Sequence, residues 1–338
     1  MGTTDIPLDL VLMTDDHETV DSVAEQARLA EDHGFSHVTM GETTGWNIVP
    51  VLSVIAERTE EIGITDDVLS PYSRAPTTIA QTALTMHEVT DGRFRLGLGT
   101  SSPALAERWH ASEFDRPLRR LRETVDIVRA VYDGGSVTYE GDIYEVGGLS
   151  YERAVPEEPP AIDVAALGPK GTELSGRFAD GWVPQLFTVE ALEDRLGDLR
   201  RGAELGGRSV EDVRVSPLIR CFASDEPERA RSMGRSMIAF LVGAYGPFYG
   251  DSVAEQGYEE AVAEIRAAWE ERDTAAMAEA LPEELLDAVA AVGTPENVRD
   301  RLRRFAEIDG VDAIRVGFVS GMDQADKERT LDVVGSLG

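Results

Sequence analysis

The residues best suited to bind an anion are the five from Gly168 to Thr172, which read Gly-Pro-Lys-Gly-Thr. They join an apolar run, Ala161–Leu167, to a segment with helical periodicity, Gly171–Ala179. In the first turn of a helix the backbone N–H groups are unpaired and the dipole is positive, and both favour a phosphate. Lys170 is one of only two lysines, so its charge stands out from the composition. The run favours a phosphate site over the alternative, a helix-start turn with an incidental lysine.

Small polar residues also follow the other apolar runs. Most are hydroxyl residues or glycines, which suits a site that binds an organic cofactor and leaves the chemistry to it. Glu42 is the one carboxylate flanked by small polar residues and an aromatic residue, Trp46. It could orient a substrate or relay a proton, or it could be a solvated loop residue. The residues at these positions are Glu42–Thr44, Asp66–Ser70, Thr100–Ser102, Gln185 and Ser320.

Two other kinds of catalytic site do not fit the sequence. A metal hydrolase needs several histidines and carboxylates at strand ends, but most of the five histidines fall on predicted helices or strand starts. A serine nucleophile would need a strained strand-to-helix elbow and a base. The single cysteine, Cys221, cannot form an internal disulfide and is most simply a buried small apolar residue. We expect no metal site.

The elements that position these residues alternate between apolar runs and helical patterns. Eight strand–helix units predict one (β/α)8 barrel domain over residues 1–338. A doubly wound open sheet is the alternative, but no Gly-x-Gly-x-x-Gly follows the first strand. The predicted strands are Leu8–Met13, His37–Met40, Ile62–Val68, Phe94–Leu98, Ala161–Leu167, Gly181–Phe187, Val213–Phe222 and Asp312–Phe318. The predicted helices include Glu18–His33, Ile48–Glu61, Pro76–Val89, Leu118–Tyr132, Gly171–Ala179, Val189–Ala203 and Asp323–Val334.

Two segments interrupt the alternation. Ser136–Gly148 reads as a β-hairpin inserted after the fourth unit. The acidic segment Ala230–Ala291 predicts a helical insertion after strand seven, broken near Pro247, where Tyr245, Phe248 and Tyr249 cluster.

The charge balance limits the partners. The chain has 63 acidic and 32 basic residues, a formal net charge of −31, which argues against binding to nucleic acid or anionic membranes. No apolar run is long enough to span a membrane, and Met1–Pro7 lacks the organisation of a secretory signal, so we expect a cytoplasmic protein. An acidic, lysine-poor surface suits molar salt, where the Debye length is about 3 Å. We therefore expect a halophilic protein of haloarchaeal type.

Three blocks resemble the luciferase-like superfamily of flavin and deazaflavin oxidoreductases. They are similar to its coenzyme F420 branch, particularly to methylenetetrahydromethanopterin reductase. The blocks are Asp66–Ser101, Ala165–Trp182 with its Gly-Pro-Lys and Ala-Asp-Gly, and Val292–Val316. Together with the hairpin and the helical insertion, the likeness covers nearly the whole chain.

The resemblance implies roles for the matched residues. A non-prolyl cis peptide near Asp67 and Val68 would back the deazaflavin ring, and Thr65 and Ser70 would flank it. Thr100 and Ser101 would contact the cofactor tail. The family also implies a small-molecule substrate and a homodimer or higher homo-oligomer. The phosphate of the tail would be held by Gly168, Pro169, Lys170, Gly171 and Thr172.

The sequence departs from the family pattern at two positions. Relatives that oxidise alcohols or sugar phosphates carry an Asp-His pair after strand two, where this chain has Glu42 and Thr43. Without that histidine, reductive hydride transfer is favoured over alcohol oxidation. The aspartate that the pterin reductase carries after strand four is replaced by Ser101 and Ser102.

We therefore expect an F420-dependent oxidoreductase that moves hydride between the deazaflavin and a small organic substrate, with a methylene-pterin-type acceptor as one candidate and Glu42 as an orienting or proton-relaying group. One alternative is a luciferase-like monooxygenase that uses FMN. The other is a member of the family that binds flavin without catalysis.

Overall fold

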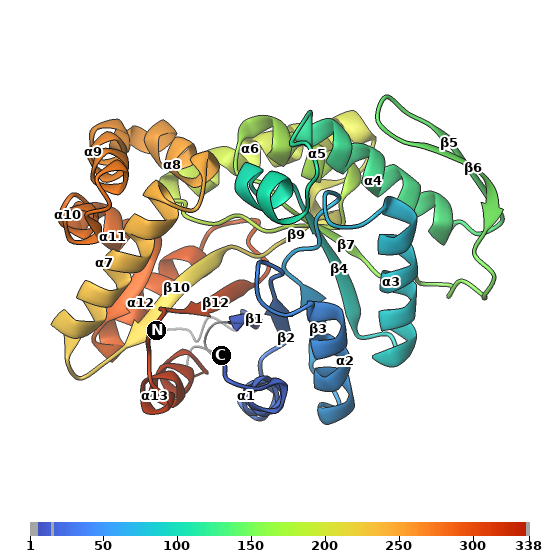
Figure 1. The fold of residues 1–338 in the computed structure, drawn as a ribbon. Helices are drawn as coiled ribbons and strands as arrows, with labels where there is room; N and C mark the ends of the chain where they lie inside the picture. Colours follow the sequence, from blue (N-terminus) through green and yellow to red (C-terminus); the bar gives the residue numbers. More distant parts are fainter. Residues whose placement is uncertain (1–5, 15–16, 336–338) are drawn as a thin grey trace.

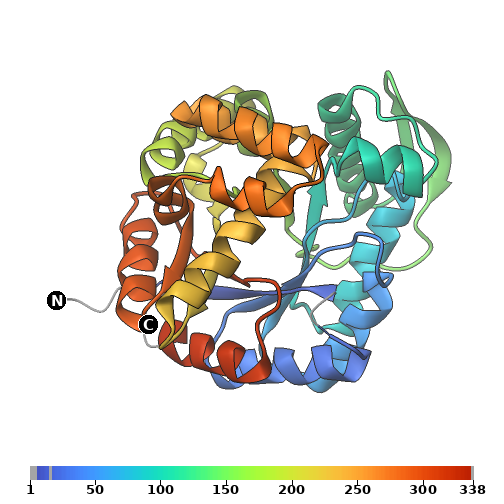
Figure 2. The same cartoon turned by 60° about the vertical axis from the view of Figure 1, so that its left-hand side comes forward.

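A curled, parallel ten-stranded sheet forms the centre of the protein, and helices cover its outside (Figures 1 and 2). The computed structural model describes residues 6–14 and 17–335, so most of the Met1–Pro7 segment lies outside the described residues. The strand order is β11-β10-β12-β1-β2-β3-β4-β7-β8-β9. The strands are β1 Leu8–Leu12, β2 His37–Met40, β3 Gly63–Asp66, β4 Phe94–Gly99, β7 Ile162–Ala165, β8 Gly181–Trp182, β9 Arg214–Val215, β10 Leu218–Ala223, β11 Ala290–Gly293 and β12 Ile314–Phe318.

The two ends of the strand order approach each other. β8 pairs with β9, β10 pairs with β12, and a parallel bridge joins Gln185 to Leu218. The strand predicted at Val213–Phe222 is wrong in one respect, because it divides into β9 and β10 around Ser216 and Pro217. Proline has no N–H to give to the ladder, which explains the break.

Helices follow the strands of this sheet, and the sequence marks several of their ends. Thr19 forms a capping box, and Thr188 and Thr294 accept N-cap hydrogen bonds. The prediction for Pro76–Val89 is confirmed: the helix begins with Pro76 in its first turn and ends at Val89, with Thr90 as its C-cap. These helices are α1 Val20–Asp32, α2 Ile48–Arg58, α3 Pro76–Val89, α4 Pro117–Tyr132, α5 Pro169–Phe178, α6 Val189–Gly206, α12 Pro295–Ala306 and α13 Gln324–Gly335.

The predicted hairpin is confirmed. β5 (Ser136–Glu140) and β6 (Glu145–Ser150) pair antiparallel and project beyond α4 at the edge of the molecule (Figure 1). The buried carboxylate of Glu123 on α4 accepts the N–H groups of Asp142, Ile143 and Tyr144 at 2.9–3.0 Å. One side chain thereby fixes the hairpin turn to the helix.

Helices also dominate the segment after β10, as predicted. They are α7 Pro227–Gly243, α8 Pro247–Val253, α9 Glu259–Glu270, α10 Thr274–Glu279 and α11 Glu283–Val289. The predicted end of this helical segment at Ala291 is wrong, because Ala290–Gly293 forms β11 and pairs parallel with β10. A four-residue apolar run that directly follows a helix has no period of its own to mark it as a strand.

Charged side chains from several strands lie buried inside the curled sheet. Arg315 on β12 is 1% exposed, and its guanidinium lies 3.2 Å from Asp163 on β7 and 3.8 Å from Asp9 on β1. Burial opposes ionisation of Asp9, but the side chains of His37 and Arg214 lower its pKa to about 2. Buried charges persist where they are paired in this way. Among residues 6–14 and 17–335, no helix combines the length and apolarity needed to cross a bilayer.

Candidate active site

The centre of the site is a bulge that follows β3. The Asp67–Val68 peptide is cis and non-prolyl, which confirms the prediction for this pair. The Asp66 carboxylate beneath it is buried and accepts hydrogen bonds from the N–H groups of Leu69 (2.8 Å) and Gly97 (2.9 Å). Burial raises the pKa of Asp66 to about 7, against the opposing effect of these two hydrogen bonds. The Asp66 carboxylate thus connects the residue that follows the bulge, Leu69, to Gly97 on β4.

Three glycines make space for the bulge. A Cβ at Gly99 would overlap Val68, and one at Gly97 would overlap the Asp66 carbonyl oxygen. A Cβ at Gly41 would lie 2.7 Å from the Asp67 carbonyl oxygen. At Gly41, Gly97 and Gly99 the neighbouring chain therefore offers only backbone where the bulge approaches it.

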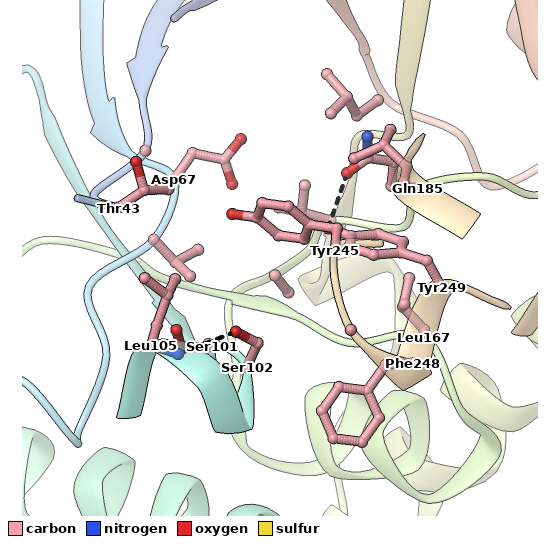
Figure 3. Close-up of a pocket in the computed structure, with 18 of the residues that line it drawn as sticks. Thr43, Asp67, Ser101, Ser102, Leu105, Leu167, Gln185, Tyr245, Phe248 and Tyr249 are labelled. Carbon is pink, nitrogen blue, oxygen red and sulfur yellow. Dashed lines mark hydrogen bonds between the residues drawn. The ribbon is translucent and has the colours of Figure 1, made fainter. Parts of the chain in front are cut away.

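Asp67 points its carboxylate into the cavity, toward the ring of Tyr245 (Figure 3). Thr39 on β2 donates its hydroxyl to Asp67 Oδ2 at 3.2 Å, and Arg315 Nη1 lies 3.4 Å from the same oxygen. The charge of Asp67 is therefore balanced by the buried arginine within the sheet.

Glu42, at the end of β2, is held by an ion pair. Arg74, in the loop after the bulge, donates from both terminal nitrogens to the two carboxylate oxygens, with Nη2 2.7 Å from Oε1. The Glu42 side chain is 10% exposed and that of Arg74 is 14% exposed. The hydrogen bond to Glu42 raises the pKa of Arg74. With both oxygens engaged, the geometry suits an orienting group better than a proton relay.

A cavity of about 1500 Å³ collects most of the predicted site residues. That exceeds the usual 300–1,000 Å³ of a small-molecule site, so it has room for a cofactor and a second molecule. Gly168, Pro169, Lys170 and Gly171 lie at the N-terminus of α5, where Gly168 is the N-cap and Pro169 the first residue. The predicted residues that line the cavity are Glu42, Asp67, Val68, Thr100, Ser101, Gly168, Pro169, Lys170 and Gly171.

Three predicted residues do not line this cavity. Thr65 is buried within β3, and Ser70 is buried and accepts the N–H of Tyr72 at 3.2 Å. Thr172 is buried and donates its hydroxyl to the Gly168 carbonyl oxygen at 3.2 Å. They lie behind the residues that face the cavity.

The opposite wall of the cavity comes from the segment after β10 and was not predicted. Tyr245, Phe248 and Tyr249 face the bulge from α8 and the turn before it (Figure 3). Tyr249 donates its hydroxyl to Gln185 Oε1 at 3.1 Å. The aromatic cluster at Pro247 was the available signal, but sequence alone does not show that a helix so far along the chain covers this rim.

The cofactor implied by the resemblance fits the residues present. A flat ring needs a smooth wall, which Val68 and the glycine strand β4 supply. A phosphate needs unpaired N–H groups and positive charge, which the first turn of α5 and Lys170 supply. Among the described residues, no group of three or more histidine, cysteine or acidic side chains is arranged to hold a metal ion.

Together the parallel sheet and the cavity beside its strands define an α/β protein in which most of the predicted site residues share one pocket. Residues 6–312 match the family described as luciferase-like monooxygenase, so the chain belongs to that family.

The names of similar proteins specify a cofactor in two cases and a pterin substrate in two. A putative coenzyme F420-dependent oxidoreductase of Mycobacterium tuberculosis is 30% identical over 82% of this chain and 86% of its own. A 5,10-methylenetetrahydromethanopterin reductase of Archaeoglobus fulgidus is 26% identical over 91% of this chain and 92% of its own. The structure of the F420-dependent tetrahydromethanopterin reductase of Methanopyrus kandleri has a TM-score of 0.81 at 22% identity, over 98% and 97% of the two chains.

Proposed function

We propose that this protein is a coenzyme F420-dependent oxidoreductase that transfers hydride between the deazaflavin and a small organic substrate. The observation that carries the proposal is a single cavity that connects the Asp67–Val68 bulge to the N-terminus of α5. The relative named as a putative F420-dependent oxidoreductase, which covers 82% of the chain, supports the choice of cofactor.

With F420 as the cofactor, a role follows for each group of residues in and behind the cavity. Val68 backs the ring, Thr100 and Ser101 contact the tail, and Gly168, Pro169, Lys170 and Gly171 hold the phosphate. Thr65, Ser70 and Thr172 support these residues from behind, and Asp67 is fixed at the ring by Arg315. When bound, F420 supplies a two-electron hydride carrier. The chain itself contributes orientation of the two reactants, which can lower a barrier by about 7–11 kcal/mol.

Reduction of the substrate is the favoured direction. Oxidation of an alcohol needs a base for the hydroxyl proton. Among the described residues that line the cavity there is no histidine, and Thr43 stands where alcohol-oxidising relatives carry one. Glu42 acts as the orienting residue of this rim. A methylene-pterin-type acceptor is one candidate substrate, which the relatives named as pterin reductases support.

An FMN-dependent monooxygenase is the second candidate. The FMN complex of the oxygenating constituent of 3,6-diketocamphane monooxygenase from Pseudomonas putida shares the fold, with a TM-score of 0.70 at 16% identity over 98% and 96% of the chains. FMN also carries a phosphate that α5 could hold. A family member that binds flavin without catalysis is the third candidate.

Titration at molar salt separates these candidates. Oxidised F420 and FMN are added in turn, and quenching of tryptophan fluorescence gives each dissociation constant. Trp182 reports on the tail, because its indole N–H donates to the Ala166 carbonyl oxygen beside the cavity. We expect F420 to bind more tightly than FMN, and the reverse order would select the monooxygenase. Binding of F420 without turnover across a broad substrate panel would select the non-catalytic member.

We also propose the finer features expected from the sequence. The curled sheet, with β9 and β10 as one interrupted strand, supports a single (β/α)8 barrel domain over residues 1–338, with the hairpin and the segment 230–291 as insertions. The net charge of −31 supports a cytoplasmic protein of haloarchaeal type, with no nucleic-acid or membrane partner. A homodimer or a higher homo-oligomer is the proposed assembly.

A further inference from the structure

Arg120, near the start of α4, lies where three segments that are distant in the sequence meet. Its guanidinium carbon lies 4.8 Å from the ring centroid of Tyr72 and 5.5 Å from that of Tyr144. Tyr72 belongs to the loop after the bulge, and Tyr144 belongs to the turn of the β5–β6 hairpin. Arg120 also forms an ion pair with Asp115, in the loop between β4 and α4. Arginine suits such a place because its planar group can stack on aromatic rings while it pairs with a carboxylate.

Two tyrosine hydroxyls connect the same segments by hydrogen bonds. Tyr144 donates its hydroxyl to the Pro71 carbonyl oxygen at 3.2 Å, and Arg120 Nη1 donates to the Tyr144 hydroxyl oxygen at 3.3 Å. Tyr72 donates its hydroxyl to the Asp115 carbonyl oxygen at 2.9 Å. Because the hairpin turn is also bonded to α4, these contacts hold the loop after the bulge and the loop after β4 against one support.

Aromatic rings lead from this support to the cavity. The ring of Phe114 stacks on that of Tyr72, with centroids 5.0 Å apart and 25° between the planes. Phe114 also lies 5.9 Å from the ring of Phe248, which lines the cavity from α8 (Figure 3). A second close approach joins the same segments, since a Cβ on Gly246 would lie 3.5 Å from Ser102 Cβ. The loop after β4 and the segment after β10 therefore touch, although they form different walls of the cavity.

The place of the Phe248 ring depends on this contact. Phe248 is 38% exposed, and its one ring contact among the described residues is with Phe114. Exposed segments with few buried contacts are the ones that open locally in a folded protein. The contact with Phe114 therefore keeps this part of the wall closed.

From these contacts we infer that Arg120 is a positioning residue of the active site. It holds Phe114 by way of Tyr72 and Asp115. Phe114 in turn holds Phe248 in the cavity wall. A bound ligand is retained while the two walls stay joined, so Arg120 sets how fast the ligand leaves. The inference rests on the proposed function for the identity of that ligand, F420.

Stopped-flow measurement of deazaflavin fluorescence at molar salt tests the inference, because it gives both rate constants of F420 binding. Arg120→Met removes the guanidinium and keeps an unbranched side chain. It should raise the dissociation rate constant by about 5–10-fold, the effect expected when one aromatic contact is lost. The association rate constant should rise or stay the same, because a loosened wall does not hinder entry. A variant that had merely lost structure would associate more slowly, since a smaller fraction of it could bind.

The chain offers a second variant and a matched control. Phe114→Leu breaks the same connection without altering Arg120, and should give the same increase. Arg122→Met is the control on the same helix. Arg122 also pairs with a carboxylate, Asp126, and lies 4.1 Å from the ring centroid of Phe178, but it has no such contact with either loop among the described residues. Both rate constants should stay unchanged in this control.

Amide hydrogen exchange in the protein without ligand gives a second readout. Arg120→Met and Phe114→Leu should each speed exchange in residues 111–116 and 244–250, and Arg122→Met should not. Dissociation within twofold of the unaltered protein in both variants would overturn the inference, as would slower association in both or unchanged exchange in residues 244–250. If one variant fails to fold, the other decides. If F420 does not bind, the proposed function fails, but the exchange of residues 244–250 still decides whether Arg120 positions Phe248.

Discussion

Gly99 and Val68 lie in contact across neighbouring strands, with no space between them for another carbon atom. A Cβ built on Gly99 would overlap the Val68 side chain, and one on Gly97 would lie 3.2 Å from Val68 Cγ1. Val68 is the second residue of the cis peptide and lines the cavity. The position of the surface proposed to support the ring therefore depends on the absence of side chains at Gly97 and Gly99 of β4.

Gly99→Ala tests this dependence. The new methyl group must displace Val68 into the cavity, because neither strand backbone can yield within the sheet. We expect F420 to bind at least tenfold more weakly, measured by fluorescence titration at molar salt. Gly197→Ala on α6 is the matched control, since no atom lies within 4 Å of its added Cβ. Unchanged affinity in Gly99→Ala would contradict the proposed place of the ring.

The Glu42–Arg74 pair allows a test of what Glu42 does. If it is an orienting residue, Glu42→Gln should lower the free energy of unfolding by about 1–3 kcal/mol, because the mostly buried guanidinium of Arg74 loses its charged acceptor. Arg74→Gln should have a similar effect, and the double variant should lose less than the sum of the two. Urea unfolding at constant salt measures all three.

A proton relay would give a different pattern. Glu42→Gln would then slow turnover by orders of magnitude while its stability stayed close to that of the unaltered protein. Such a result would return Glu42 to a catalytic role and leave Arg74 as its positioning partner.

Much of the framework could be predicted from the sequence because its signals are local. Pro76 and the Thr90-Asp91-Gly92 stop define α3 to the residue, whereas α5 begins at Pro169, two residues before the predicted start at Gly171. The rim residues followed from this framework, since parallel strands bring their carboxyl ends to one edge. The cis peptide was predicted from family resemblance and not from any local signal.

The remaining features depend on contacts between distant residues. Glu42 meets Arg74 across 32 positions, and Gln185 meets Tyr249 across 64. No periodicity encodes which side chain of a long helical segment will face a rim. Pro217 was a local signal for the interruption between β9 and β10. The apolar residues on both sides of it nevertheless predicted one continuous strand.

Asp66 predicts a stability that falls as pH rises. Its pKa is about 7 in the folded protein and about 3.9 in an unfolded chain, so the folded state binds the additional proton between these values. This group therefore contributes stability that is complete below pH 4 and is lost as pH rises through 7. Asp66→Asn should flatten the decline in unfolding free energy between pH 4 and pH 7, measured by urea titration at constant salt. Asp9, with a pKa of about 2, acts only below this window. An equal slope in both proteins would show that Asp66 is ionised throughout.

Salt should strengthen cofactor binding, and Lys170 should account for the phosphate. F420 is an anion and the protein carries a net charge of −31, so long-range repulsion opposes association until salt screens it. We expect the affinity for F420 to increase between 0.1 M and 2 M KCl.

Lys170→Gln should weaken F420 binding by about 2–10-fold, since one exposed cation at a helix N-terminus contributes of the order of 1 kcal/mol. The matched ligand is the deazaflavin riboside without phosphate, whose binding the substitution should not change. Equal losses for both ligands would place Lys170 at the ring or in the fold, and no loss for either would leave the phosphate to the backbone of α5.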